Sequence, residues 1–165
     1  MSEKLRKKII PSAGGVTMPV PANTIDIIQH AEVIATSESA NFPLDNIVDG
    51  STGPGSSQWV AGSTGPQILI FKFDVLQNIS CIIYEIEEKE IARTQEICFE
   101  VSTDSGAHYR EILRHEYNFS PDGSSFQREE LKLDLPQVTD LKMTIKPDKG
   151  NLNCTAKLNY IGLQS

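Results

Sequence analysis

Regular alternation of apolar and polar residues is the feature of this 165-residue chain that most constrains its fold. Ile97, Phe99 and Val101 alternate with polar or small residues, and the same period of two recurs over 131–135 and 140–146. Successive side chains of a β-strand point to opposite faces, so this pattern is typical of strands with one buried and one solvated face. The sequence therefore predicts antiparallel sheets whose inner faces share one core.

Eight such segments are separated by clusters of Gly, Pro, Ser and Asp, which are the residues that favour turns. The predicted strands cover residues 31–36, 67–74, 79–87, 95–102, 108–115, 126–135, 140–146 and 154–163. A short helical turn is predicted over 42–48, and no segment has the period of a longer amphipathic helix. This spacing predicts an all-β fold, namely an antiparallel β-sandwich or jelly roll of about eight strands.

The length is that of one ordinary domain. Residues 1–23 are rich in Pro, Gly and small side chains, which predicts an extended N-terminal arm followed by a domain over 24–165. The net charge of −7 argues against a nucleic-acid partner, because such binding depends on cationic side chains. No apolar run is long enough to span a membrane. The oligomeric state stays open.

Cysteine usage bears on the cellular location. Cys81, Cys98 and Cys154 are widely spaced and form neither a disulfide framework nor a zinc motif. Cys81 and Cys98 lie in apolar runs, where cysteine behaves as a small buried side chain. Because the first residues also lack the apolar core of a secretory signal, we expect a reducing, cytoplasmic location.

An ordered set of motifs resembles a known family. The stretch VIATSESANFPLDNIVDG, followed by Trp59, resembles the opening of coagulation factor 5/8 type C domains, also called discoidin domains. FEVSTDSGAHYREI, DLKMTIK and KLNYIGL resemble later segments of that family in the same order, so the resemblance spans about 30–163. It implies a galactose-binding-like β-sandwich that binds a ligand without catalysis. Trp59 is expected to fill the core rather than to stack on a sugar.

The resemblance also implies a structural calcium ion near the turn Asp49–Gly50. Oxygen ligands on a constrained loop suit this hard cation. The candidate ligands are Asp45, Asn46, Asp49, Ser51 and Ser57. The family usually adds a Glu from the last strand, where this chain offers Asn159. Since the neutral amide removes one of few charges, a hydrogen-bonded turn without metal is the favoured alternative.

Galactose-type members of the family bind sugar with an aromatic platform and with Arg, His and Asn side chains on loops at one rim. The matching candidates in this chain are Phe42, Arg93, Asn118, Phe119 and Asn151. Two simpler interpretations stay open. Phe42 and Phe119 could pack beneath their loops, and Arg93 could belong to a solvated, charged hairpin.

No grouping of residues predicts an enzyme. His30, His108 and His115 are scattered, and no zinc spacing, nucleophile elbow or phosphate loop is present. Two functions therefore remain. The first is carbohydrate binding through rim loops, with no cofactor except a possible structural calcium ion. The second is a role as a protein-interaction subunit of the same fold. An open cleft holding Arg93 and an exposed aromatic residue would favour the first, and closed loops would favour the second.

Overall fold

The predicted all-β fold is confirmed by the computed structural model, which describes residues 5–7 and 23–165. The strands are β1 (Arg6–Lys7), β2 (Ala31–Ala35), β3 (Trp59–Val60), β4 (Gln67–Glu87), β5 (Arg93–Ser102), β6 (Arg110–Phe119), β7 (Phe126–Lys146), β8 (Lys157–Leu158) and β9 (Tyr160–Gln164). The helical elements are α1 (Ile27–His30) and the 3-10 helix η1 (Leu44–Val48). No helix within these described ranges is long and apolar enough to cross a membrane.

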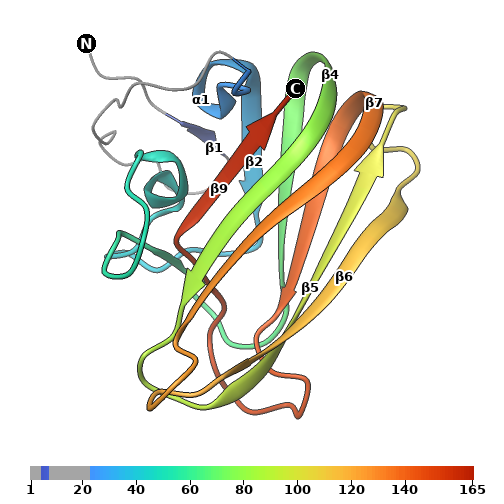
Figure 1. Cartoon of the computed structure of the whole chain (residues 1–165). Helices are drawn as coiled ribbons and strands as arrows, with labels where there is room; N and C mark the ends of the chain where they lie inside the picture. The colour runs from blue at the N-terminus through green and yellow to red at the C-terminus, as the bar shows by residue number, and fades with distance from the viewer. Residues whose placement is uncertain (1–4, 8–22) are drawn as a thin grey trace.

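Strands β4 and β7 each contribute to both layers of the sandwich. The first half of β4 pairs with β2 and with the second half of β7. The second half of β4 pairs with β9 and with the first half of β7. Both strands bend over at the end of the molecule where the C-terminus lies (Figure 1). The four strands predicted in these two stretches are therefore two long, bent ones.

The bend has a local cause in each strand. In β4, shifts of register interrupt the pairing between Lys72 and Cys81. In β7 the bend falls at Gln137, whose φ of 57° lies in the left-handed region. The backbone N–H of Gln137 donates to Oδ1 of Asn78 over 3.1 Å. This bond ties the two bends to each other.

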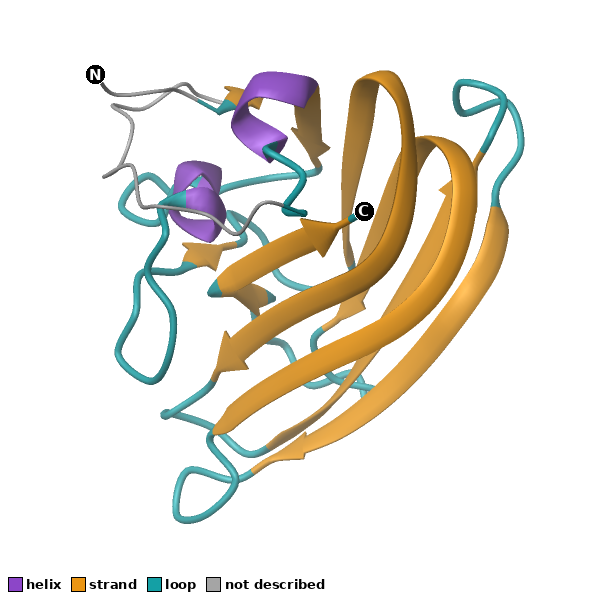
Figure 2. Ribbon diagram, turned by 45° about the horizontal axis from the view of Figure 1, so that its top comes forward, coloured by secondary structure: helices purple, strands orange, loops and turns teal. Residues whose placement is uncertain are grey.

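The bends produce two layers that face each other (Figure 2). One layer holds β2, β5, β6 and one half each of β4 and β7, and the other holds β9 and the remaining halves. Tyr84 of the second layer meets Phe99 of the first, with ring centroids 5.6 Å apart. Both side chains are fully buried, as are Phe71 and Trp59. Burial of aromatic side chains on this scale is the main driving force for the fold.

Trp59 has the structural role expected of it. Its side chain is fully buried, and its indole N–H donates to the carbonyl of Ser37 over 3.0 Å. It also lies in the short pair β3–β8, opposite Leu158. The turn that precedes it has Gly50 at a φ of 87°, a conformation that glycine adopts without strain.

Several predicted boundaries were wrong. The strand expected from residue 108 begins at Arg110, and the last predicted strand is divided into β8 and β9. The turn predicted at 42–48 is η1, with Pro43 at its N-cap. Helix α1, which was not predicted, has a single turn and is capped by Asp26, whose side chain accepts from the N–H of Gln29. An element this short leaves no periodic signal in the sequence.

Most of the arm predicted over 1–23 falls outside the described residues. The part that is described does not stand apart from the domain. Arg6 and Lys7 form β1, which pairs with β2 in parallel, and Leu5 is buried in the core.

Candidate functional site

Loops 88–92, 120–125 and 147–156 lie at the end of the sandwich opposite the bends, in the lower part of Figure 1. We call this end the lower rim. Four of the five predicted sugar-binding residues lie on strands or loops at this rim: Arg93, Asn118, Phe119 and Asn151. The fifth, Phe42, lies in a segment joined to it through hydrogen bonds from Val60 to Phe42 and from Ala61 to Ala156.

Arg93 does not line an open cleft, because its side chain is fully buried and only 4% of the residue is exposed. Its Nε donates to Glu88 over 2.9 Å, and its Nη1 donates to the Pro147 carbonyl over 2.8 Å. The guanidinium also stacks over the ring of Phe119, which is itself buried. Arg93 and Phe119 therefore join β5 to β6 beneath the rim, and neither is an exposed contact for a ligand.

Glu88 is the buried partner of this guanidinium. Burial by itself raises the pKa of the Glu88 carboxyl, but hydrogen bonds from Lys157 and Arg93 outweigh it and lower that pKa overall. Arg93 and Lys157 thus share one buried carboxylate, that of Glu88. An uncompensated buried charge would be strongly unfavourable, which explains why Glu88 lies between two cationic side chains.

The other three predicted binding residues, Phe42, Asn118 and Asn151, are exposed. Asn118 accepts a bond from Thr94 Oγ1 over 2.8 Å, and Asn151 has a φ of 63°. The loop that carries Asn151 is fixed by Asp148, whose carboxylate accepts from the backbone N–H groups of Leu152 and Thr94. These bonds lower the pKa of Asp148. The lower rim is therefore braced by hydrogen bonds, with Asn118 and Asn151 exposed on it and Phe42 exposed in the segment joined to it.

The residues predicted to bind calcium do converge. Asp49 Oδ1 accepts from the N–H and the hydroxyl of Ser51 over 2.9 and 2.7 Å, and Asp49 Oδ2 accepts from the hydroxyl of Ser57. The Ser57 hydroxyl also lies 3.4 Å from the carbonyl of Asn46. Asp45 lies apart from this set, on η1, where it is buried.

This donor set does not suit a calcium ion. It has one carboxylate, and both of its oxygens already accept hydrogen bonds. No cluster of three or more His, Cys, Asp or Glu side chains with metal-binding geometry occurs within residues 5–7 and 23–165. A calcium site needs about six to eight oxygen ligands, several of them charged. Calcium and the metal-free turn both stay predictions, and the hydrogen bonds among Asp49, Ser51 and Ser57 favour the second.

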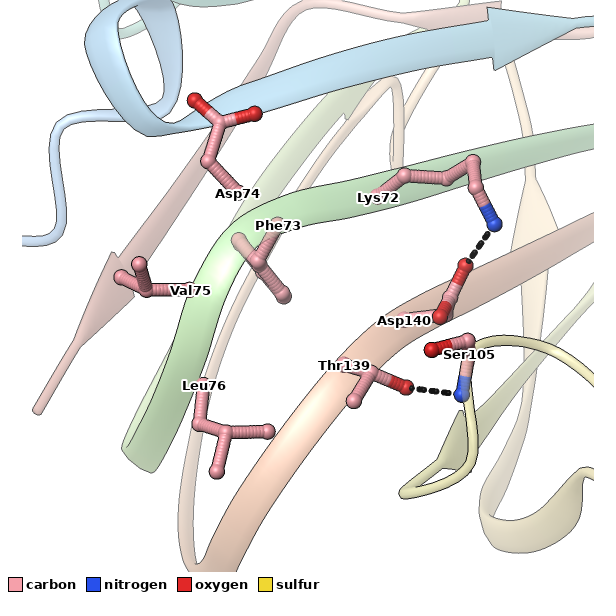
Figure 3. A pocket seen from close by; sticks show the side chains of 8 residues that line it. All are labelled: Lys72, Phe73, Asp74, Val75, Leu76, Ser105, Thr139 and Asp140. Atoms are coloured by element: carbon pink, nitrogen blue, oxygen red, sulfur yellow. Dashed lines mark hydrogen bonds and ion pairs between the residues drawn. The ribbon is translucent and has the colours of Figure 1, made fainter.

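A hollow of about 420 Å³ opens at the opposite end of the sandwich, where β4 and β7 bend. We call it the bend hollow. Figure 3 shows side chains that surround it from the bend of β4, from β7 and from the loop after β5. They are Lys72, Phe73, Asp74, Val75, Leu76, Ser105, Thr139 and Asp140. Its volume lies within the range of ligand pockets, about 300–1,000 Å³.

The polar wall of the bend hollow is an ion pair with spare hydrogen-bonding capacity. Lys72 Nζ lies 2.6 Å from Oδ2 of Asp140 (Figure 3), and this bond raises the pKa of Lys72. The lysine is half-exposed, whereas the Asp140 side chain is almost fully buried. Since an ammonium group has three hydrogens, Lys72 can donate to a ligand while it holds Asp140. Asp74 forms a second ion pair, with Arg6.

The opposite wall is apolar. Phe73 is partly buried against the core, but Val75 and Leu76 are 63% and 57% exposed. Isolated exposed apolar residues are common on protein surfaces. Two adjacent ones at the edge of a polar hollow give that hollow one apolar and one hydrogen-bonding side.

The loop that carries Ser105 at the bend hollow is held by several hydrogen bonds. Ser102 Oγ accepts from the N–H groups of Asp104 and Gly106 and donates to Asp104 Oδ1. The N–H of Ser105 donates to Thr139 Oγ1 over 2.9 Å (Figure 3), and Thr139 in turn donates to the carbonyl of Ser102. The sequence pattern predicted a turn between the strands 95–102 and 108–115 but not its contact with the bend. That contact joins segments distant in sequence, and no local pattern signals it.

The two layers and the bent long strands define a β-sandwich of the kind found in carbohydrate-binding modules. A module from a family 31 glycoside hydrolase of Clostridium perfringens is 18% identical, with 87% of this chain and 95% of that chain covered and a TM-score of 0.64. A family 32 module from NanJ of the same organism, in complex with galactose, is 13% identical, with 87% and 98% covered and a TM-score of 0.63. A pectin-binding module is 18% identical, with 83% and 91% covered and a TM-score of 0.56. At these identities the likeness establishes the fold.

The sequence assigns the chain to a family within this fold. The F5/8 type C domain matches residues 32–156, and the chain belongs to that family. The resemblance inferred from the motifs is thereby confirmed. A search of curated protein sequences gives no significant match.

Proposed function

We propose that this protein is a non-catalytic module that binds neutral carbohydrate in the bend hollow. Membership of the F5/8 type C family supports a binding role. Two proteins of the same fold are described as bound to galactose and as pectin-binding, which supports a carbohydrate ligand. Burial of Arg93 and Phe119 makes both side chains unavailable at the lower rim, which supports placing the proposed site in the bend hollow.

The observation that carries the proposal is the amphipathic lining of the bend hollow. Lys72 and Asp140 offer a donor and an acceptor at one wall, and Leu76 and Val75 offer apolar surface at the other. A pyranose ring has the same two characters, with hydroxyl groups around its edge and C–H groups on its faces. Ligand sites of this kind combine apolar surface with a few placed polar groups.

Charge selects for a neutral sugar. Lys72, the basic residue among those that line the hollow, is paired with Asp140, and Asp74 of the same lining is paired with Arg6. No net positive charge is left to attract a uronate or a sialylated sugar, and the chain as a whole is acidic. We therefore expect galactose to bind better than galacturonate.

The residues beside the hollow support binding rather than catalysis. His108 Nδ1 lies 2.6 Å from Asp104, which resembles part of a catalytic triad. However, the hydroxyl of Ser102 donates to Asp104, not to His108. A serine nucleophile needs the histidine as its base, with the acid behind it. Ser102 is also buried and holds the loop together.

The test is an NMR titration of the isotope-labelled chain with galactose, and with galacturonate as the charged counterpart. We expect galactose to shift the amide signals of Leu76, Ser105 and Thr139. A concentration of up to about 10 mM is sufficient for a dissociation constant near 1 mM. Galacturonate should give smaller shifts. Loss of the Lys72 hydrogen bond in Lys72→Met should weaken binding by about tenfold.

Leu76→Ser provides a second variant, because Leu76 is exposed and its replacement should leave the fold intact. The matched control is Phe42→Ala, in the segment joined to the lower rim, which should bind as the wild type does. Shifts centred on Phe42, Asn118 and Asn151 would move the site to the lower rim. Absence of shifts with either sugar, together with a blank glycan array, would overturn carbohydrate binding altogether.

A role in protein interaction is the second candidate, and the exposed pair Val75 and Leu76 favours it. Adjacent exposed apolar residues are a common feature of contact surfaces. Affinity capture with the wild type and with the double variant Val75→Ser, Leu76→Ser compares the two roles. A partner lost only with the double variant, in a protein that does not bind sugar, would favour protein interaction.

A further inference from the structure

We infer that the loop between Asp49 and Trp59 is held in place by a metal-free hydrogen-bond network centred on Asn159. The calcium ion that the family resemblance implies has no role in it. This inference concerns the end of the domain around η1 and β9 and does not depend on carbohydrate binding. It is argued from three groups of contacts.

The first group satisfies the carboxylate of Asp49. Its two oxygens accept from the backbone N–H of Ser51 and from the hydroxyls of Ser51 and Ser57. The two hydroxyls also lie 2.7 Å from each other. For a cation to bind here, hydroxyl hydrogens that now face the carboxylate would have to turn away. The charge of Asp49 is therefore already compensated by the loop itself.

The second group uses both ends of the Asn159 amide. Asn159 is fully buried, and its Oδ1 accepts from Gln58 Nε2 and from the backbone N–H of Glu87, each over 2.9 Å. Its Nδ2 donates to the hydroxyl of Ser56 over 3.2 Å and lies 3.5 Å from the Ser56 carbonyl. A carboxylate at this position could not donate to Ser56. The Asn159 amide thus acts as both donor and acceptor, and its N–H groups point toward Ser56 of the loop.

The third group consists of hydrogen bonds from the backbone of the loop to the carboxylates of Glu85 and Glu87. Glu85 Oε1 accepts from the N–H of Gly53 over 2.7 Å, and Glu87 Oε1 accepts from the N–H of Gly55 over 2.9 Å. The second oxygen of Glu85 pairs with Arg128. Gly53 and Gly55 both have a φ of 84°, and an added Cβ would meet no atom within 4 Å. Glycine is required at these two positions for its conformation rather than for space.

Together these contacts leave no oxygen set for calcium. Both oxygens of Asp49 accept from hydroxyls, Asn159 carries no charge, and Glu85 and Glu87 accept from N–H groups of the loop. Each buried polar group in such a network has a partner, which is the condition under which a polar network stabilises a fold. We therefore expect the stability of the protein to be the same with and without calcium.

The experiment is thermal unfolding of the full chain in calcium chloride and in EDTA. The inference predicts midpoints that agree within about 1 °C, whereas a site saturated at a hundredfold excess over its dissociation constant would raise the midpoint by about 5–10 °C. Terbium, whose luminescence is sensitised by a nearby tryptophan, serves as a second probe of the same loop. A saturable terbium signal or a calcium-dependent midpoint would overturn the inference.

Variants test the central role of Asn159. Asn159→Ala should lower the midpoint by the same amount in both buffers, and Gln58→Ala, at a half-buried position, should do so more mildly. Asn153→Ala, at an exposed asparagine of the preceding loop, is the matched control and should unfold as the wild type does. A loss of stability seen only in EDTA, or none at all in Asn159→Ala and Gln58→Ala, would contradict the network.

Discussion

The guanidinium carbon of Arg93 lies 4.7 Å from the centre of the Phe119 ring, and neither side chain is open to solvent. A desolvated cation over an aromatic face contributes about 2 kcal/mol or more. The pair joins the first residue of β5 to the last residue of β6, directly opposite each other in the sheet. Arg93 is therefore a structural residue of the lower rim.

Replacing Arg93 by Met should destabilise the protein strongly. The change leaves Glu88 buried with Lys157 as its only cationic partner, and loss of one member of a buried pair costs about 3–5 kcal/mol. Urea denaturation measures the change. Arg114→Met is the control, because its pairs with Glu96 and Glu111 involve a half-exposed arginine and should contribute at most about 1 kcal/mol. Equal effects of the two substitutions would refute the assignment of Arg93.

Acid should destabilise the protein through Glu88. The folded-state pKa of this carboxyl is lowered below its ordinary value of 4.5, so its contribution is complete above that pH. The contribution is lost as the pH falls through the lowered pKa, because the unfolded chain then binds the proton more readily. The free energy of unfolding, measured by urea titration between pH 6 and 3 in wild type and Glu88→Gln, should fall more steeply in the wild type. Parallel curves would rule this out.

Cys98 should be unreactive in the folded protein. Burial raises the pKa of its thiol to about 11, and the side chain is nearly inaccessible. Because the thiolate is the reactive form, alkylation near pH 7.5 should be slow until the protein unfolds. The three cysteines are free and buried, so a thiol assay should detect them only in denaturant. Rapid modification of one equivalent in native buffer would show that the fold opens locally.

Gly106→Ala should destabilise the protein through backbone strain. Gly106 has a φ of 89°, where an alanine is strained by about 1–2 kcal/mol. An added Cβ would also lie 3.4–3.6 Å from Tyr109 Oη, Asp140 Oδ2 and Lys72 Nζ. Gly123→Ala is a matched control, because that glycine has no left-handed φ and nothing lies within 4 Å of the added atom. Calorimetric unfolding of the two variants should separate them clearly.

Local patterns predicted the strands well because each has one buried face. The alternation at Ile97, Phe99 and Val101 becomes the inner face of β5, and all three side chains are buried. The joining of predicted strands into β4 and β7 was missed, because the predicted strands left gaps at 75–78 and 136–139. Both segments instead lie within strands that bend.

The sites were predicted less well, for a physical reason. The sequence shows that Arg93 lies near a loop. Whether its side chain is buried depends on the segments that cover it, and these carry Glu88 and Pro147. The same holds for the bend hollow, where Lys72 meets Asp140 across a strand pair of long sequence separation. Only Asp49, Ser51 and Ser57, which are neighbours in sequence, could be grouped in advance.

The bent strands also determine how the chain must fold. Gln67 pairs with Ile145 and Glu87 pairs with Phe126, so both layers depend on the pairing of β4 with β7. This pairing encloses the middle of the chain in a large loop. Ordering that large loop is unfavourable until the pairing is nearly complete, and domains dominated by such distant contacts fold in about milliseconds to seconds. Neither layer can form early without the other. We therefore expect a slow, single-phase refolding reaction in stopped-flow measurements, with β4 and β7 pairing in the rate-limiting step.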